Sequence, residues 1–431
     1  MEDKFLRILN DRGIQGELVQ IRSYRFVVNF EHNRFKGIEE GETSGIAVRV
    51  KKNGKFGFSF STDVNDIEGV IARALENAEF SQEAIFDFAS DKNFPEVLCY
   101  DEEVTNMSRD EIINQGKEVI DYVDSLKSGI QAFFSGSKNI IEEKITTTSG
   151  FSGVFKKSVA SLQIGGMFNE EGNFLWVYGS LARSAKKLLD VEILKNKIKE
   201  NLKDAGKNVQ IESGMFPVIF TPFSIEYLLL PFVVAINGRN VVKGTSVLKD
   251  SLNETIFSKN LTIINDPLMP YGISTVPFDD EGIPSQKREI ISNGKLINYL
   301  NDLYSATKLN LEPGNASRSL STLPSPSPSN IVIKSGTEKL SDMLKLKKGI
   351  IIESLMGAQM GNVSGGEVTG NIDLGYLVEN GEIVGRIKDA MISVNIMDAL
   401  KDVVLSDTTT WTMGIVAPYV LIPSAPISTK L

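Results

Sequence analysis

Hydrophobic and polar residues alternate in two stretches near the start of the chain, at residues 24–31 and 45–60. Alternation with a period of two is typical of strands that bury one face. Asn53 and Gly54 interrupt the second stretch as a two-residue turn signal, so we expect a β-hairpin there. Apolar residues then recur at helical spacing within residues 67–78, which predicts a helix packed on the sheet.

A second unit is expected after a linker at residues 81–107. Ser108 and Glu111 have the spacing of a capping box, and apolar residues behind them recur at helical spacing. Strand-like segments follow, with a turn expected at Asn169–Asn173. The helical pattern of residues 190–206 ends at a glycine, as a helix C-terminus commonly does.

The second half of the chain is rich in strand-like segments, and Asn-Gly pairs at 293–294 and 380–381 predict hairpins within it. We therefore predict an α+β fold with two domains. The N-terminal domain, residues 1–206, is mixed α/β with hairpins and packed helices, and it contains smaller units at about 1–85 and 108–206. The C-terminal domain, residues 207–431, is β-rich.

One apolar segment in this half, from Tyr227 to Ile236, directly precedes a polar, glycine-containing stretch at residues 237–246. Pro231 lies inside the segment, and proline is tolerated at the start of a helix or at the edge of a sheet. The pattern alone predicts a buried helix start or a strand, without chemistry of its own.

Composition narrows the classes of function. Of the 431 residues, 42% are apolar and 23% charged, which is typical of a globular protein. The net charge of −9 argues against binding to nucleic acid, and no apolar run reaches the roughly 20 residues that span a bilayer. We therefore expect a cytoplasmic protein with no membrane contact. His32 is the only histidine and Cys99 the only cysteine, so metal sites and catalytic pairs built on those residues are excluded or strained.

Three motifs could carry chemistry. Ser135–Lys138 and Ser305–Lys308 match the S-x-x-K pattern of penicillin-recognising enzymes, although each is more simply an ordinary polar segment. Asp279, Asp280 and Glu281 form a carboxylate run that could hold a hard cation. The alternative for this run is a loop or an ion pair with nearby Lys287 or Arg288. The glycine-rich stretch 357–371 lacks the spacing of a phosphate-binding loop, and it forms either turns or a substrate-facing loop.

Longer stretches resemble a known family. Residues 275–319 contain FDDEG, the segment ISNGKL and the loop GNASRS, and further similar stretches lie at 45–63, 328–336 and 370–389. In this order they resemble the TldD/PmbA family, also called modulators of DNA gyrase. The similarity extends over nearly the whole chain.

The resemblance implies which branch the chain is most similar to. The TldD branch carries HExxxH on a helix before a GTS-type loop and binds zinc, whereas the PmbA/TldE branch lacks that motif and pairs with TldD. Here Gly244, Thr245 and Ser246 follow the apolar segment, whose residues 229–234 include no histidine or glutamate, and no cysteine follows Cys99. We therefore expect no metal site and no catalytic residue in this chain, with zinc in a TldD-type partner.

The function that this resemblance implies is a noncatalytic PmbA/TldE-like subunit of a TldD-type zinc metallopeptidase complex, acting in proteolysis of unfolded or modified peptides. The partner is a TldD-like subunit in a heterodimer, or a second copy in a homodimer, and the substrate is a peptide. The alternatives are an autonomous peptidase with an atypical site and a regulator acting on DNA gyrase. Candidate peptide-contacting or cavity-lining residues come from three loops: Asn237, Arg239, Asn240, Thr245, Asp279, Asp280, Glu281 and Asn362.

Overall fold

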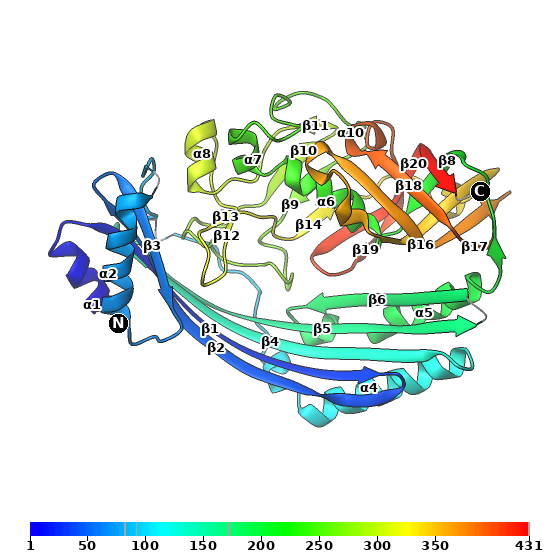
Figure 1. Cartoon of the computed structure of the whole chain (residues 1–431), viewed down its shortest axis with the longest axis horizontal. Coiled ribbons are helices and arrows are strands. Elements are labelled where there is room, and N and C mark those ends of the chain that lie inside the picture. The colour runs from blue at the N-terminus through cyan, green and yellow to red at the C-terminus, as the bar shows by residue number, and fades with distance from the viewer. Residues whose placement is uncertain (82, 92, 171–172, 430–431) are drawn as a thin grey trace.

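A computed structural model describes residues 1–81, 83–91, 93–170 and 173–429. The described strands form two large sheets, one of six strands and one of twelve. The long strands of the first sheet make a curved layer along one side of the second (Figure 1). The predicted α+β class is confirmed, with helices in both halves and a β-rich C-terminal part.

The six-stranded sheet has the order β3-β2-β1-β4-β5-β6, and all its neighbours are antiparallel. Its strands come from both sides of the predicted linker, because β1 pairs with β4. The bounds are β1 (Gln15–Glu31), β2 (Arg34–Lys52), β3 (Lys55–Ser61), β4 (Gln131–Thr147), β5 (Ser152–Glu170) and β6 (Asn173–Arg183).

Helices cover this sheet through separate apolar clusters. One cluster joins α1 (Glu2–Asn10) and α2 (Ile67–Asn77) to the strands near β2. Another joins α4 (Arg109–Leu126) and α5 (Val191–Asp204) to the sheet, and it continues into the C-terminal half through residues such as Tyr376. The short helix α3 (Glu102–Asn106) interrupts the predicted linker. The two halves therefore share one of their cores.

The twelve-stranded sheet is built entirely from residues after α5. Its main path is β11-β10-β9-β14-β20-β8-β15-β16-β17-β7, with β18 and β19 attached to it. The bounds are β7 (Asn208–Val209), β8 (Gly214–Phe220), β9 (Ile263–Asn265), β10 (Arg288–Ser292), β11 (Lys295–Leu296), β14 (Ile331–Ile333), β15 (Lys348–Met356), β16 (Glu367–Glu379), β17 (Glu382–Ile387), β18 (Ala390–Asn395), β19 (Val404–Trp411) and β20 (Ile415–Thr429). A separate pair is β12 (Ala316–Ser317) with β13 (Ser325–Pro326).

Short helices connect these strands. They are α6 (Ile225–Ala235), α7 (Gly238–Val242), α8 (Leu303–Leu309), α9 (Leu340–Met343) and α10 (Ile396–Ala399), with the 3₁₀ turns η3 (Ala358–Met360) and η4 (Val363–Gly365). Two further 3₁₀ turns lie in the N-terminal half: η1 (Ala78–Phe80) after α2 and η2 (Lys186–Leu188) before α5. Of the described helices, none has the length and apolar character that crossing a membrane requires.

The predicted hairpin turns form as expected. Asn53 and Gly54 both adopt positive φ between β2 and β3, as a two-residue turn of this type requires. Asn293 and Gly294 do the same between β10 and β11. The turn predicted at Asn169–Asn173 includes residues 171 and 172, which lie outside the described residues.

Two strands are longer than their patterns predicted. β1 begins at Gln15 rather than near residue 24, and β2 begins at Arg34 rather than near residue 45. The first half of β2 is mostly exposed on both faces, so it carries no alternation of apolar and polar residues. Pairing with β1 along its whole length holds it in the sheet.

Candidate functional site

Helix α6 is formed by the apolar segment noted in the sequence. Its buried residues lie on several sides of the helix, namely Ile225, Leu228, Leu229, Pro231, Phe232 and Ala235. Such a helix is apolar nearly all round, as expected for one packed within a core. Its polar side chains at the first turn are Glu226 and Tyr227, and the Tyr227 hydroxyl lies 3.4 Å from that of Tyr178 on β6. The helix thus stands beside the edge strand of the N-terminal sheet.

The loop after α6 is fastened by its own polar side chains. Asn237 accepts a hydrogen bond from the Arg239 N–H at 2.9 Å and donates one to the Pro326 carbonyl at 2.9 Å. The Arg239 Nε donates to Asp302 at 2.6 Å. These contacts tie α7 to the start of α8 and to β13.

The rest of this loop folds back on α6. The Asn240 side chain donates to the Val234 carbonyl at 2.9 Å, and the Asn240 backbone carbonyl accepts from the Thr245 N–H at 3.0 Å. Ser246 donates to the Ala235 carbonyl at 2.5 Å. The Asn240 side chain is therefore engaged by protein groups, whereas Thr245 is exposed on the surface.

The carboxylate run spreads in different directions. Asp279 accepts hydrogen bonds from three backbone N–H groups, those of Glu281, Ile283 and Ala316, at 2.9–3.0 Å. Burial and the nearby Glu281 raise the pKa of Asp279 well above its ordinary value. These bonds shape the loop, and the three carboxylates do not converge on one point that a cation could occupy.

Glu281 takes part in a buried ion-pair network with the N-terminal sheet. Its carboxylate accepts from Arg49 of β2 at 2.7 Å. Arg49 also donates to Glu17 of β1 at 2.9 Å, and Glu17 accepts from Arg318 at 2.8 Å. Of the two structural alternatives for this run, the loop is confirmed, whereas no described ion pair joins it to the nearby cations. Lys287 pairs with Asp266 at 2.7 Å, and Arg288 donates to the Glu312 carbonyl and to Gln286.

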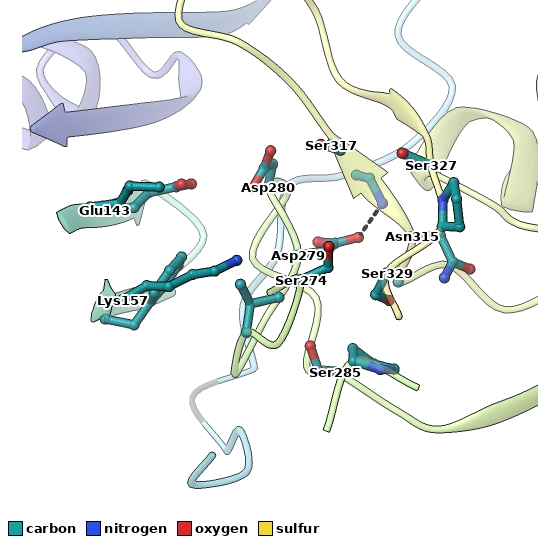
Figure 2. Close-up of a pocket in the computed structure, with 17 residues that line it drawn as sticks. Glu143, Lys157, Ser274, Asp279, Asp280, Ser285, Asn315, Ser317, Ser327 and Ser329 are labelled. Carbon is teal, nitrogen blue, oxygen red and sulfur yellow. Dashed lines mark hydrogen bonds between the residues drawn. The ribbon is translucent and has the colours of Figure 1, made fainter. Parts of the chain in front are cut away.

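Asp280 faces strands β4 and β5 of the N-terminal sheet. Its carboxylate accepts from the Arg318 N–H at 2.6 Å, and it lies near Glu143 of β4 and Lys157 of β5. Burial raises the pKa of Glu143 well above its ordinary value, and the Asp280 charge adds to this. Burial also lowers the pKa of Lys157. Figure 2 shows Glu143 and Lys157 reaching from neighbouring strands toward Asp279 and Asp280.

Three pockets lie next to one another around α6 and the carboxylate loop. The first, of about 40 Å³, is lined by Tyr178 on β6 and by Glu226. The second, of about 400 Å³, runs along α6 and shares Glu226 and Ile415 with the first. The third, of about 190 Å³, contains Asp279 and Asp280 and shares Pro328 and Ser329 with the second. Because each pocket shares lining residues with the next, we call the three together the groove, which extends from the β6 edge to the carboxylate loop.

The glycine-rich stretch borders this groove. Ala358 and Gln359 line the middle pocket, and η4 packs against α6. Asn362 is exposed and caps η4, since its side chain accepts from the Gly365 N–H at 3.0 Å. The positive φ of Gly357 and Gly366 favours glycine at both positions. The stretch therefore forms tight turns beside α6.

Only two of the eight candidate peptide-contacting residues line the groove. Asp279 and Asp280 line it, whereas Asn237, Arg239, Asn240, Thr245, Glu281 and Asn362 are not among the described lining residues. Sequence reasoning missed Glu143 and Lys157, which reach the groove only because β4 and β5 pass beneath it. Their one sequence signal is charge within otherwise strand-like segments.

The remaining motif residues have structural roles. Ser305 is buried and donates to Asp302 at 2.6 Å, within a reciprocal capping box of α8. Ser135 donates to Asn29 at 2.8 Å. His32 is exposed and its Nδ1 lies 2.9 Å from the Gln131 side-chain oxygen, and Cys99 is buried.

Comparison with family profiles identifies this architecture. Residues 213–429 match the profile of the PmbA/TldA metallopeptidase C-terminal domain, and residues 16–78 match domain 1 of the same family. The chain belongs to the PmbA/TldD family. The first match covers half of the chain and includes α6 and the carboxylate loop, and the second covers most of β1 together with β2, β3 and α2.

Two curated relatives match most of this PmbA/TldD family member, and a third matches less than half of it. An uncharacterized protein of Methanocaldococcus jannaschii is 26% identical over 413 residues, covering 93% of this chain and 94% of its own. A metalloprotease of the same organism is 27% identical over 403 residues, covering 86% and 85%. The metalloprotease PmbA of Escherichia coli O157:H7 is 31% identical over 189 residues, covering 44% and 40%.

Solved structures share the fold. A Thermotoga maritima protein described as a candidate modulator of a DNA gyrase superimposes with a TM-score of 0.91 at 23% identity, covering 99% of both chains. TldE from Thermococcus kodakarensis gives a TM-score of 0.90 at 20% identity, again covering 99% of both.

The metallopeptidase description raises the question of whether α6 fits a metal. Zinc in proteins takes imidazole, thiolate or carboxylate ligands in tetrahedral arrangement. The groove face of α6 offers one carboxylate, Glu226, among Leu229, Leu230 and Val233. Among the described residues, no group of three His, Cys, Asp or Glu is placed to hold a metal ion. The residues at α6 do not fit a zinc ion.

Proposed function

We propose that this chain is the noncatalytic, PmbA/TldE-like subunit of a TldD-type zinc metallopeptidase complex that degrades unfolded or modified peptides. The observation that carries the proposal is the chemistry of α6. Within a family described as metallopeptidases, this helix presents Leu229, Leu230 and Val233 to the groove beside a single carboxylate. Such a surface can contact substrate but offers too few ligands for zinc.

The groove is suited to an extended peptide. β6 is the edge strand of its sheet, and its residues Tyr178, Gly179 and Ser180 line the first pocket. An edge strand can pair with the backbone of an added strand, which gives affinity with little dependence on sequence. The mainly apolar middle pocket along α6 would take apolar side chains of an unfolded substrate.

In this proposal the partner supplies the chemistry. A TldD-type subunit holds zinc through its HExxxH helix. The present chain and this partner together enclose a chamber for the peptide, and the groove of the present chain forms one wall of it. The complex is a cytoplasmic heterodimer, with a homodimer of this chain as the alternative assembly. Asn237, Arg239, Asn240, Thr245, Glu281 and Asn362 are then residues that support or border the chamber.

The test is co-expression with a HExxxH-bearing family member from the same genome. Native mass and zinc content are recorded for each chain alone and for the purified mixture. We expect a stoichiometric complex with zinc bound by the HExxxH-bearing chain. Stoichiometric zinc in the present chain alone, or failure of the two chains to associate, would contradict the proposal.

A further inference from the structure

Lys157 is a buried ammonium group without a close partner. Its exposed fraction is 9%, yet it forms neither a hydrogen bond nor an ion pair with any described residue. Its amine points into the last pocket of the groove (Figure 2). Leaving a buried charge unpaired is costly, so a group that a ligand could satisfy remains open in this pocket.

Glu143 on the neighbouring strand hydrogen-bonds Asp280 and leaves one of its carboxyl oxygens unsatisfied. Its exposed fraction is 8%, and its Oε1 atom has no hydrogen-bond partner among the described residues. Glu143 lies opposite Phe155 in the β4–β5 ladder, and Lys157 lies opposite Ile141. The two side chains are therefore diagonal neighbours on one face of the sheet, at a typical separation of roughly 7–8 Å.

The opposite wall of the pocket is formed by the carboxylate loop. Asp280 accepts from the Arg318 N–H at 2.6 Å, and its negative charge attracts Lys157 without forming an ion pair. Opposite charges thus face the same cavity from two elements that are distant in sequence. A ligand with one charge of each sign can bridge them where the side chains themselves do not meet.

The size and lining of the pocket favour a small polar molecule. Its volume of about 190 Å³ is below the roughly 300–1,000 Å³ of sites for drug-sized ligands. Ser274, Ser285, Ser317 and Ser327 line it, and their hydroxyls can donate or accept hydrogen bonds.

We propose that this pocket binds a small zwitterion, either a free α-amino acid or a dipeptide, with its carboxylate at Lys157 and its ammonium group at Asp280. Peptide cleavage releases molecules of this kind, so the biological source of the ligand rests on the proposed function. Binding itself requires only the present chain. A failure here is therefore distinguishable from a failure of the subunit proposal.

Isothermal titration of the full chain with four probes tests the proposal. L-alanine and L-alanyl-L-alanine carry both charges, whereas N-acetyl-L-alanine carries only the carboxylate and L-alaninamide only the amine. We expect at least one zwitterion to bind with a Kd of about 1 mM or tighter, and both singly charged probes to bind at least about tenfold more weakly. L-alanine binding alone assigns a free amino acid, and dipeptide binding alone assigns a dipeptide.

Variants locate the site. Lys157→Met should weaken binding of the zwitterion by about tenfold or more, since one charged contact is lost. Lys156→Met is the matched control, because Lys156 is the adjacent residue and is exposed. Asp280→Asn keeps an oxygen that can accept from the Arg318 N–H, and it should weaken binding of the zwitterion by a similar factor. This variant tests the site independently if Lys157→Met does not fold.

Three results would overturn the proposal. They are no binding of either zwitterion, equal binding of a singly charged probe, and unchanged binding by folded Lys157→Met or Asp280→Asn.

Discussion

Arg49 on β2 and Glu281 in the loop between β9 and β10 lie 232 positions apart in the chain and form a hydrogen bond of 2.7 Å. Their side chains have exposed fractions of 3% and 0%. Glu17 and Arg318 extend the pair into a network that fastens the carboxylate loop to the N-terminal sheet. The last pocket of the groove depends on this junction, since its walls come from both sides of it.

Arg49→Met should be strongly destabilising. The substitution leaves Glu17 and Glu281 buried without this partner, and removing one member of a buried pair typically costs about 3–5 kcal/mol. Urea denaturation measures the free energy of unfolding. Arg22→Met is the control, because Arg22 pairs with Glu42 on the surface and exposed pairs contribute about 1 kcal/mol or less. Equal, small losses in both variants would show that the buried network does not hold the junction.

Glu143 should make stability fall as pH rises. Burial and Asp280 raise its pKa in the folded protein above the ordinary value of 4.5. The folded state therefore favours the protonated form, and that contribution is complete below about pH 4.5 and is lost as pH rises through the folded pKa. Glu143→Gln mimics the protonated form, so its free energy of unfolding should fall less than that of the natural chain between pH 4.5 and 8.

Glu17 provides the opposite case in the same network. Burial disfavours its charged form, but Arg318 and Arg49 outweigh burial and lower its pKa. Its contribution is present above the ordinary value of 4.5 and is lost as pH falls through the folded pKa. Glu17→Gln should therefore be most destabilising near pH 7, with the difference from the natural chain shrinking on acidification. Parallel pH profiles for Glu143→Gln and Glu17→Gln would contradict both assignments.

Gly238→Ala should disturb the loop after α6. A Cβ atom at Gly238 would lie 2.1 Å from the Asn301 side chain and 2.8 Å from the Leu300 carbonyl. Overpacking of this kind costs about 1–3 kcal/mol. Gly41→Ala on β2 is the control, because its Cβ would meet no atom within 4 Å. A thermal melt that shifts equally for both variants would remove the argument for close packing here.

Leu230→Trp should obstruct the middle pocket of the groove. Leu230 lines this pocket, and a larger ring there competes with the side chains of a bound peptide. Ile193→Trp on α5 is a matched control, because Ile193 and Leu230 are both helical with exposed fractions of 37%. In complexes of equal stoichiometry, we expect peptide cleavage to fall at least about tenfold for Leu230→Trp alone. Unaltered cleavage would place the peptide elsewhere.

Local signals in the sequence predicted much of the fold. The turn at Asn53 and Gly54 and the helical spacing within residues 67–78 depend on neighbouring residues, so the pattern predicts them correctly. The polar first half of β2 carries no such signal, because neither of its faces is consistently buried. Its strand structure is imposed by pairing with β1.

The site could be predicted less completely. The residues at 279–281 attract notice because three acidic side chains are consecutive, but their partners Arg49 and Arg318 come from distant segments. Lys157 looks like an ordinary charged residue in a strand until β5 places it under the carboxylate loop. Such pairings depend on how the two sheets meet, which no local pattern encodes.

Cleavage of an unfolded peptide by each chain alone and by the mixture tests the central claim most directly. The measurement uses the present chain and the HExxxH-bearing family member, with and without a zinc chelator. The account predicts that cleavage requires both chains and is abolished by chelation. Cleavage by the present chain alone would contradict it, and so would full activity of the HExxxH-bearing chain without its partner.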